Sequence, residues 1–317
     1  MSTTTTAGAR WDSAYHAPVL VDEVSSLLRE SRAVLDCTLG GGGHSLALLE
    51  TGVPSVTALD RDPHAITAAQ ARLATYERAG RFQAILGNYA RVDEIAVLRD
   101  ARFDGALLDL GVSSHQIDDP SRGFSFREGA PLDMRMGADA SETAADILNG
   151  RDERELAYIF KEYADEPRAV RLAREVTRRR RTRAFATSDD LVNAIRGALG
   201  ARAGPADFAR IFQGVRIAVN DELDGLDRAL PRLRDLLEPG GILAVIAYHS
   251  GEDRRVKLAL REWSAACVCP PRQPVCTCRG RPLGQLVARK AIAPTAPELA
   301  RNPRSRSAKL RAWRKGE

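Results

Sequence analysis

The sequence predicts an α/β protein in which a helical domain is inserted into a domain built on a parallel sheet. Short apolar runs alternate with helical patterns from Val34 to Asp109, a spacing typical of strand–helix–strand units. Residues 140–220 carry several helical patterns and no strand signal. A continuous apolar run, Ile242–Tyr248, then follows, as expected for a buried central strand.

A glycine-rich turn follows the first predicted strand, which ends at Asp36. Four consecutive glycines, residues 40–43, precede a helical pattern that starts near Ser45. The free N–H groups and the helix dipole at such a turn favour a nucleotide-type pocket. The dinucleotide pattern Gly-x-Gly-x-x-Gly fits poorly, because Ser45 takes the third glycine's place. Asp36, and Asp60 at the end of the next strand, instead suit S-adenosylmethionine, although a tight turn without a ligand stays an alternative.

The elements before residue 110 alternate regularly. Strands are expected at 56–60, 82–86 and 103–109. After the strand 56–60, Asp62 can cap a helix that Pro63 opens, and a second helix is expected after the strand 82–86, through Ile95 and Leu98. Because parallel strands present their carboxyl ends at one edge, four residues are expected to converge there. They are Asp36, Asp60, Tyr89 and Asp109.

The alternation of strands and helices ends after Asp109. A long ordered loop reaches Met136, and helices are predicted at 144–148, 153–160, 168–179, 189–199 and 206–220. Leucines at helical spacing follow from 223 to 237, and Pro231 is expected to break that helix in two. Residues 239–241 should end it, and His249 follows the strand 242–248. Segments 285–292 and 307–313 predict an antiparallel pair, giving seven strands.

Composition predicts a globular protein of 317 residues, with a formal charge of +5 and a pI near 9.1. Arginines cluster at 178–183 and again within 301–315, which indicates either a polyanion partner or solvated helix faces. No apolar run is long enough to cross a bilayer, and the first residues lack the apolar centre of a signal peptide. We therefore expect a cytoplasmic protein with a flexible tail at residues 1–14.

Four of the five cysteines form two C-x-C pairs, Cys267 with Cys269 and Cys276 with Cys278. This arrangement could hold zinc, but ordinary zinc ribbons use C-x-x-C, so the spacing alone assigns no metal ligand. A disulfide framework is not expected in a chain without an export signal. Cys37 is expected to be a buried packing residue.

Several sequence blocks resemble one family. They include D-C-T-L-G-G-G-G-H-S, D-G-A-L-L-D-L-G-V-S-S-H-Q, R-G-F-S-F, P-L-D-M-R-M, Y-H-S-G-E-D and N-P-R-S-R-S-A-K-L-R. The family is the bacterial 16S ribosomal RNA cytosine-N4 methyltransferases, and the resemblance extends from Tyr15 to Arg311. It implies a Rossmann-like class I S-adenosylmethionine-dependent methyltransferase sheet at 15–118 and 217–317. The inserted helical domain, 119–216, would recognise RNA.

The resemblance also implies residue roles. S-adenosylmethionine, the methyl donor, would be held by Gly42, Gly43, His44, Asp60, Tyr89, Asp109 and Gln116. As catalytic hypotheses, Asp109 or the backbone carbonyls just after it would hold the cytosine amine, and His249 would take its proton. Phe124, Phe126 or Tyr248 would stack on the base. Relatives commonly read S-S-P-Q and H-S-L-E-D, where this chain has His115 before Gln116 and Gly251 before Glu252. The implied partner is 16S rRNA in the small ribosomal subunit, with no membrane.

Two other functions compete with this one. A non-catalytic ribosome-assembly factor could retain the fold, although the acids at the strand ends weigh against it. A dehydrogenase would require nicotinamide binding, and the glycine pattern fits that poorly. In the methyltransferase interpretation, Arg178–Arg183 would contact phosphates, which makes RNA binding sensitive to salt. The sequence does not indicate the oligomeric state.

Overall fold

The computed structural model describes residues 10–13, 17–270, 272–273 and 275–317. Its contacts divide the chain into two compact units, a sheet unit of Met1–Gly111 with Leu223–Glu317 and a helical unit of Val112–Glu222. The sequence placed these boundaries after residues 118 and 216. The difference arises because residues 112–118, which contain the short helix α4 Ser114–Asp118, and the last residues of α9 Pro205–Asn220 belong to the helical unit.

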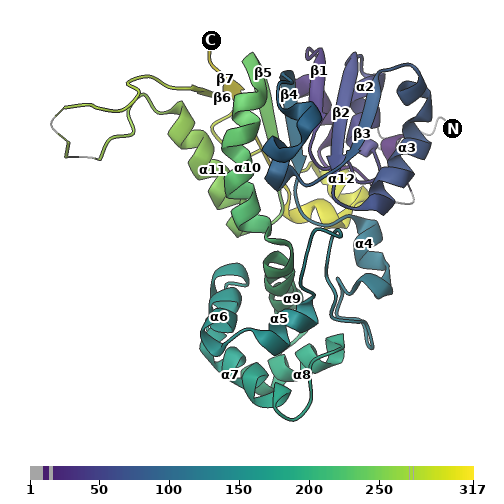
Figure 1. Ribbon diagram of the computed structural model, residues 1–317, viewed down its shortest axis with the longest axis vertical. Coiled ribbons are helices and arrows are strands. Elements are labelled where there is room, and N and C mark those ends of the chain that lie inside the picture. Colours follow the sequence, from purple (N-terminus) through teal and green to yellow (C-terminus); the bar gives the residue numbers. More distant parts are fainter. Residues whose placement is uncertain (1–9, 14–16, 271, 274) are drawn as a thin grey trace. The chain divides into compact units, whose positions relative to one another are not determined.

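The sheet unit contains seven strands in the order β3-β2-β1-β4-β5-β7-β6 (Figure 1). They are β1 Ala33–Asp36, β2 Ser55–Asp60, β3 Phe82–Leu86, β4 Phe103–Asp109, β5 Leu237–Ala247, β6 Gly284–Leu286 and β7 Lys309–Lys315. The first five in space are parallel, and β7 is antiparallel to both β5 and β6. The predicted α/β class, the parallel sheet and the closing antiparallel pair are confirmed.

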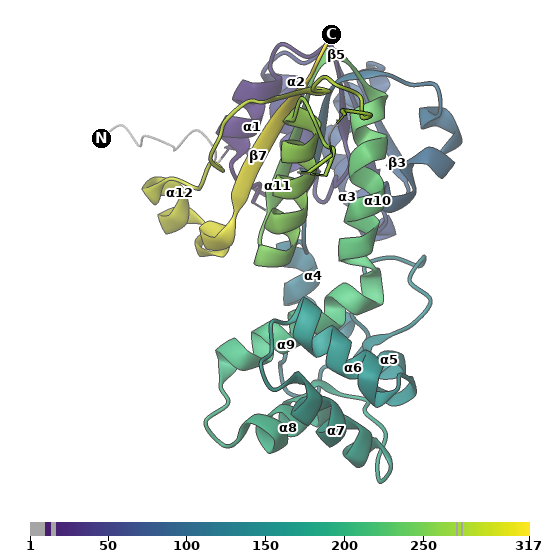
Figure 2. The same ribbon diagram turned by 90° about the vertical axis from the view of Figure 1, so that its left-hand side faces the viewer.

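Helices cover both faces of this sheet. One face packs against α1 Val21–Leu28, α2 Gly43–Glu50 and α3 Pro63–Arg78. The other packs against α10 Glu222–Leu236 and α11 Ser250–Ser264, which run side by side (Figure 2). Alternate residues of β4 supply the two cores, since Leu107 faces the first layer and Leu108 the second. The C-terminal segment adds α12 Ala296–Arg301 and the 3-10 turn η6 Pro303–Ser307.

The helical unit has a hydrophobic core of its own. Its elements are α4 Ser114–Asp118, η4 Pro120–Arg122, α5 Ala144–Gly150, α6 Glu153–Tyr158, η5 Ile159–Tyr163, α7 Ala169–Arg180, α8 Ser188–Leu199 and α9 Pro205–Asn220. The five predicted helices are present, and η5 continues α6 as a π-helical turn. The segment expected as a long loop contains two short helices, because Ser113 and Asp119 cap them.

Three expectations about the sheet unit are wrong. Pro231 lies inside an unbroken α10, because Leu226, Leu230 and Leu233 are buried against the sheet and this packing outweighs the lost hydrogen bond. The strand β5 starts at Leu237, so residues 239–241 form an irregular part of it instead of ending the helix before it.

The third concerns the segment after β3, where one helix was predicted through Ile95 and Leu98. It forms two 3-10 turns, η2 Tyr89–Glu94 and η3 Ala96–Leu98, because Ile95 is extended and separates them. The side chain of Asn88 caps the first turn by accepting from the N–H of Ala90 at 2.9 Å.

Residues 10–13 also differ from the predicted flexible tail. The indole of Trp11 is buried and donates to Glu50 at 2.8 Å, and Arg72 donates to the Trp11 carbonyl. Burying a tryptophan with its N–H bonded is strongly favourable, so these residues are held in place. The rest of that tail, residues 1–9 and 14, lies outside the described residues. In the described part of the chain, no helix has the length and apolar character needed to span a membrane.

Candidate active site

The glycine turn lies at the point where the sheet changes winding direction, between the adjacent strands β1 and β4. Gly40 and Gly42 have φ of 49° and 75°, values that favour glycine. A Cβ on Gly42 would also lie 3.0 Å from Leu73 of α3. The chain therefore needs glycine at position 42 for its backbone conformation and for its close packing. Gly43 then begins α2, with its N–H groups at the turn.

Asp60 ties this turn to the end of β2. Its carboxylate accepts the N–H of Gly40 at 2.7 Å and the N–H of Asp62 at 2.9 Å. Burial raises the pKa of Asp60 to about 6, despite those two hydrogen bonds, and the charges of Asp62 and Asp36 raise it further. A carboxylate has about four acceptor positions, so Asp60 keeps capacity for ligand hydroxyls.

Asp36 supports the same turn from inside the protein. It is fully buried, and its carboxylate accepts the hydroxyl of Ser45 at 2.7 Å and the N–H of Thr38 at 3.1 Å. Burial raises the pKa of Asp36, and the neighbouring His44 opposes that shift. Asp36 therefore fixes the geometry between β1 and α2 and does not offer its carboxylate to solvent.

Asp109, at the end of β4, lies in a cluster with the buried His44 and the partly buried Tyr248. The hydroxyl of Tyr248 donates to its Oδ1 at 2.8 Å, and Nε2 of His44 lies 3.4 Å from its Oδ2. The N–H of Asp109 donates to the hydroxyl of Thr38 at 2.7 Å. Burial, and then the charge of Asp109, raise the pKa of Tyr248 well above its usual value. Tyr248 therefore stays protonated and holds the Asp109 carboxylate in one orientation.

The imidazole of His44 indicates where a ligand would bind. The side chain is 6% exposed, yet neither ring nitrogen has a hydrogen-bond partner among the described residues. A buried polar atom without a partner costs about 1–3 kcal/mol, so such atoms are uncommon in folded proteins. His44 follows the glycine turn directly, so a polar ligand at this edge of the sheet would satisfy it.

His249 is positioned by the first turn of α11. Glu252 accepts the N–H groups of Tyr248 and His249 at 2.8 and 3.3 Å, and its other oxygen lies 3.1 Å from Nε2 of His249. Gly251 lies beside the ring, since a Cβ there would be 3.1 Å from two of its atoms. The glycine that departs from the relatives' leucine thus leaves room for the imidazole next to Glu252.

The remaining predicted residues are placed as follows. Tyr89 opens η2 directly after β3, and its ring packs against the core beneath α10. Gln116 lies in the helical unit, where it forms a capping box with Ser113. Phe124 and Phe126 also belong to that unit, and Phe126 makes edge contacts with Phe208 and Phe212 at 5.8 and 6.0 Å between ring centroids.

The sequence interpretation missed two residues of this site. Thr38 accepts the Asp109 N–H, and Glu252 fixes the backbone before α11. Glu252 could have been found, because an acid three residues after His249 is the spacing of a capping box. Nothing in the linear sequence distinguishes Thr38 from any other turn residue. Tyr248 was considered for base stacking, whereas its hydroxyl is bonded to Asp109.

Comparison with known proteins establishes the family. The sequence model of the MraW methylase family matches residues 13–316. The chain belongs to the MraW methylase family. The ribosomal RNA small subunit methyltransferase H of Gemmatimonas aurantiaca is 64% identical over 300 residues, which are 95% of each chain. The protein of the same name from Anaeromyxobacter sp. strain K is 47% identical over 306 residues, covering 95% of this chain and 97% of that one.

Membership in the MraW methylase family confirms the resemblance found from the sequence blocks and the prediction of a methyltransferase. It does not favour a non-catalytic protein that only keeps the fold.

Proposed function

We propose that this methylase transfers a methyl group from S-adenosylmethionine to the N4 amine of a cytidine in the decoding region, the P site, of 16S rRNA. The names of its relatives support ribosomal RNA of the small subunit as the target. The reaction takes place in the cytoplasm, on the small ribosomal subunit. The observation that carries the proposal is the cluster of His44, Asp109 and Tyr248 beside the glycine turn.

The residues of the sheet unit fit the methyl donor. The glycines at 42 and 43 allow the turn to pack against Leu73 and Pro18, the N–H groups at the start of α2 can meet a negatively charged part of the ligand, and Asp60 can accept the ribose hydroxyls. The buried ring nitrogens of His44 make no hydrogen bond to the described residues, although Nε2 lies 3.4 Å from the Asp109 carboxylate, so a polar ligand atom can satisfy them. The ring of Tyr89 at the end of β3 offers a surface for adenine. When bound, S-adenosylmethionine supplies an electrophilic methyl group on its sulfonium.

Asp109 activates the target amine in this proposal. The lone pair of a cytosine N4 is delocalised into the ring, so the amine is a weak nucleophile. The Asp109 carboxylate accepts an N–H hydrogen bond from N4 and stabilises the positive charge that develops there as the N–C bond forms and the S–C bond breaks. Tyr248 and Thr38 hold Asp109 in place, so the carboxylate needs no rearrangement during the reaction.

His249 completes the reaction as a proton acceptor. After methyl transfer, N4 must lose one proton, and a neutral imidazole can take it. Glu252 lies 3.1 Å from Nε2 of His249 and would stabilise the imidazolium that forms. Gly251 leaves the His249 ring free of a tight contact, since a Cβ at this position would lie 3.1 Å from it.

The helical unit would hold the RNA while the target base leaves its stack. The arginines at 178–183 do not contribute equally, because several have partners within the protein. Arg178 and Arg179 bind Glu175 at 2.7 and 2.6 Å, and Arg180 donates to two backbone carbonyls. Arg181 and Arg183 are exposed, and the ion pair of Arg183 with Asp190 is long, at 4.0 Å, so these are the arginines of this cluster that we assign to phosphate contacts.

The test is methylation of small subunits isolated from cells that lack the protein. Purified enzyme with isotopically labelled donor should place label in N4-methylcytidine of 16S rRNA, measured by nucleoside mass spectrometry. Asp109→Ala should bind donor normally and transfer little label, and His249→Ala should slow the transfer. Asp227→Asn serves as a control, because Asp227 forms an exposed ion pair with Arg255 away from the site. Undiminished methylation by Asp109→Ala would contradict its role.

A non-catalytic assembly factor would leave the particles unlabelled in the same experiment. Arg181→Ala combined with Arg183→Ala should weaken binding to subunits and reduce the dependence of binding on salt. The reason is that fewer phosphate contacts displace fewer counterions from the RNA when the protein binds. An unchanged salt dependence would remove these two arginines from the interface.

A further inference from the structure

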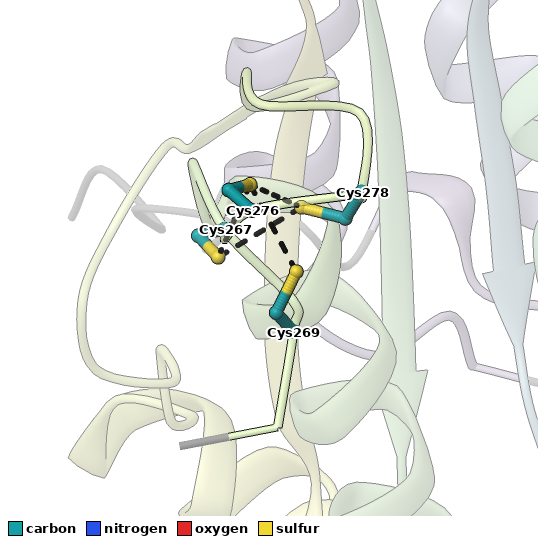
Figure 3. A group of neighbouring side chains, drawn as sticks. All are labelled: Cys267, Cys269, Cys276 and Cys278. Atoms are coloured by element: carbon teal, nitrogen blue, oxygen red, sulfur yellow. Dashed lines mark hydrogen bonds between the residues drawn. The ribbon is translucent and has the colours of Figure 1, made fainter. Parts of the chain in front are cut away.

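A cluster of four cysteines lies far from the glycine turn, in the loop between α11 and β6. Cys267 and Cys269 come from its first part, and Cys276 and Cys278 from its second. Their four sulfur atoms all lie within 4.8 Å of one another and point toward a common centre (Figure 3). The geometry points to a structural zinc ion bound by these four thiolates, a site separate from the methyl-transfer chemistry.

The distances between the sulfur atoms fit a tetrahedral zinc site. Zinc–sulfur bonds of about 2.3 Å in a regular tetrahedron place sulfur atoms about 3.8 Å apart. The Sγ of Cys276 lies 3.8 Å from those of Cys267 and Cys269. The Sγ of Cys278 lies 3.8 Å from Cys267 and 3.4 Å from Cys276. Each sulfur thus has neighbours at the separation that one shared ion requires.

Two disulfide bonds explain this arrangement less well. Sulfur atoms in a disulfide are about 2.05 Å apart and occur in pairs, with no reason for the two pairs to share a centre. All four cysteines are free thiols here. Four thiols gathered together without a bond or an ion would have no favourable interaction strong enough to hold them.

The surroundings of the sulfurs favour thiolates that ligate a metal. The N–H of Val268 donates to the Sγ of Cys278 at 3.4 Å. The N–H groups of Thr277 and Gly280 are directed at Cys269 and Cys278. Such N–H donors orient and stabilise coordinating thiolates, as outer partners do in metal sites generally.

The described residues of the loop also form no hydrophobic core that could replace the ion. Val268 and Val275 are 40% and 70% exposed. The loop is anchored at its ends, since Arg279 donates to the carbonyls of Glu262 and Ala265 and the N–H of Leu283 donates to the Trp263 carbonyl at 2.7 Å. Between those anchors, the four cysteine side chains converge on one common centre. Four protein ligands leave no open position, so the ion is structural.

The test is the metal content of tag-free protein purified without chelators. We expect about one zinc per chain, and loss of it in Cys276→Ser. Val275→Ser is the matched control in the same loop, because it removes an exposed side chain that is not a ligand. Cobalt exchanged into the wild type should give the visible absorption of a tetrahedral thiolate site, and Cys276→Ser should not. The wild-type measurements do not depend on whether the cysteine variant folds.

A second measurement follows the loop directly. After zinc removal by a chelator, trypsin should cut after Arg272 and Arg279 faster than in the zinc-loaded protein, while donor binding by the sheet unit persists. Three results would overturn the proposal: stoichiometric iron in place of zinc, thiols that alkylate only after reduction, or a trace of zinc equal in the wild type and Cys276→Ser.

Discussion

If Asp60 accepts the ribose hydroxyls of the donor, as we propose, donor affinity should depend on pH. Burial raises the pKa of Asp60 to about 6, whereas a carboxylate that accepts ribose hydroxyls must be ionised. Binding therefore competes with protonation. If the protonated form does not bind, the apparent Kd at pH 5 should be about tenfold higher than at pH 7.5, or about 1.4 kcal/mol. Near pH 6, binding should release about half a proton, because half of the Asp60 groups are then protonated.

Isothermal titration calorimetry measures both quantities, the affinity from pH 5 to 7.5 and the proton release from the heats in buffers of different ionisation enthalpy. Asp60→Asn removes the titrating group but leaves Asp36 and Asp62, the acids whose charges act on it. That variant should bind roughly 10–100-fold more weakly at pH 7.5, because it loses hydrogen bonds to a charged group. Its affinity should be nearly independent of pH. A wild-type affinity that stays constant across this range, or an Asp60→Asn curve with the same slope, would refute the reasoning.

Three further substitutions test other parts of the structure. Tyr248→Phe removes the 2.8 Å hydrogen bond to Asp109, so kcat should fall about 10–100-fold in steady-state assays with little change in donor Kd; an unchanged kcat would show that Asp109 needs no such support. Gly123→Ala should lower the free energy of unfolding by more than about 2 kcal/mol in denaturant titrations, because its φ is 72° and the new Cβ would lie 2.1 Å from the Pro131 carbonyl oxygen. Gly129→Ala, with φ of 73° and open space around it, should cost only about 1 kcal/mol, and equal losses would argue against the clash. Arg210→Met removes the 2.5 Å partner of the 1% exposed Glu166, which keeps Arg168 at 3.6 Å, and should cost about 1–3 kcal/mol by thermal unfolding, against less than about 0.5 kcal/mol for Arg174→Ala at an exposed pair; similar values would contradict this difference.

Local sequence patterns were sufficient to predict those elements whose structure depends mainly on their own residues. The strands β3 and β4 begin and end at the predicted residues, because each is an apolar run bounded by turn residues. Asp62 caps α3 as predicted, accepting the N–H of His64 at 3.0 Å. Features that depend on interactions between distant elements could not be predicted from local sequence patterns. Packing keeps α10 straight through Pro231, and pairing with β4 extends β5 back to Leu237.

The same division applies to the site. The sequence placed Asp60 and Asp109 correctly at strand ends, because strand boundaries and the parallel order are enough for that. It did not predict that Tyr248 bonds Asp109, a contact between residues 139 positions apart, or that Asp36 would turn inward to Ser45. Side-chain partners depend on rotamers and on the twist of neighbouring strands, which a linear pattern does not contain.

The position of β7 has a consequence for how the chain matures on the ribosome. The strand β5 pairs with β4 on one side and with β7 on the other, although α11, the cysteine loop, β6 and α12 separate β5 from β7 along the chain. A nascent chain therefore exposes an unpaired edge of the apolar β5 until Lys309–Lys315 has been synthesised, whereas the helical unit is translated before β5 begins. During that interval the open edge can pair with other chains, so the sheet is protected against aggregation only once β7 is in place.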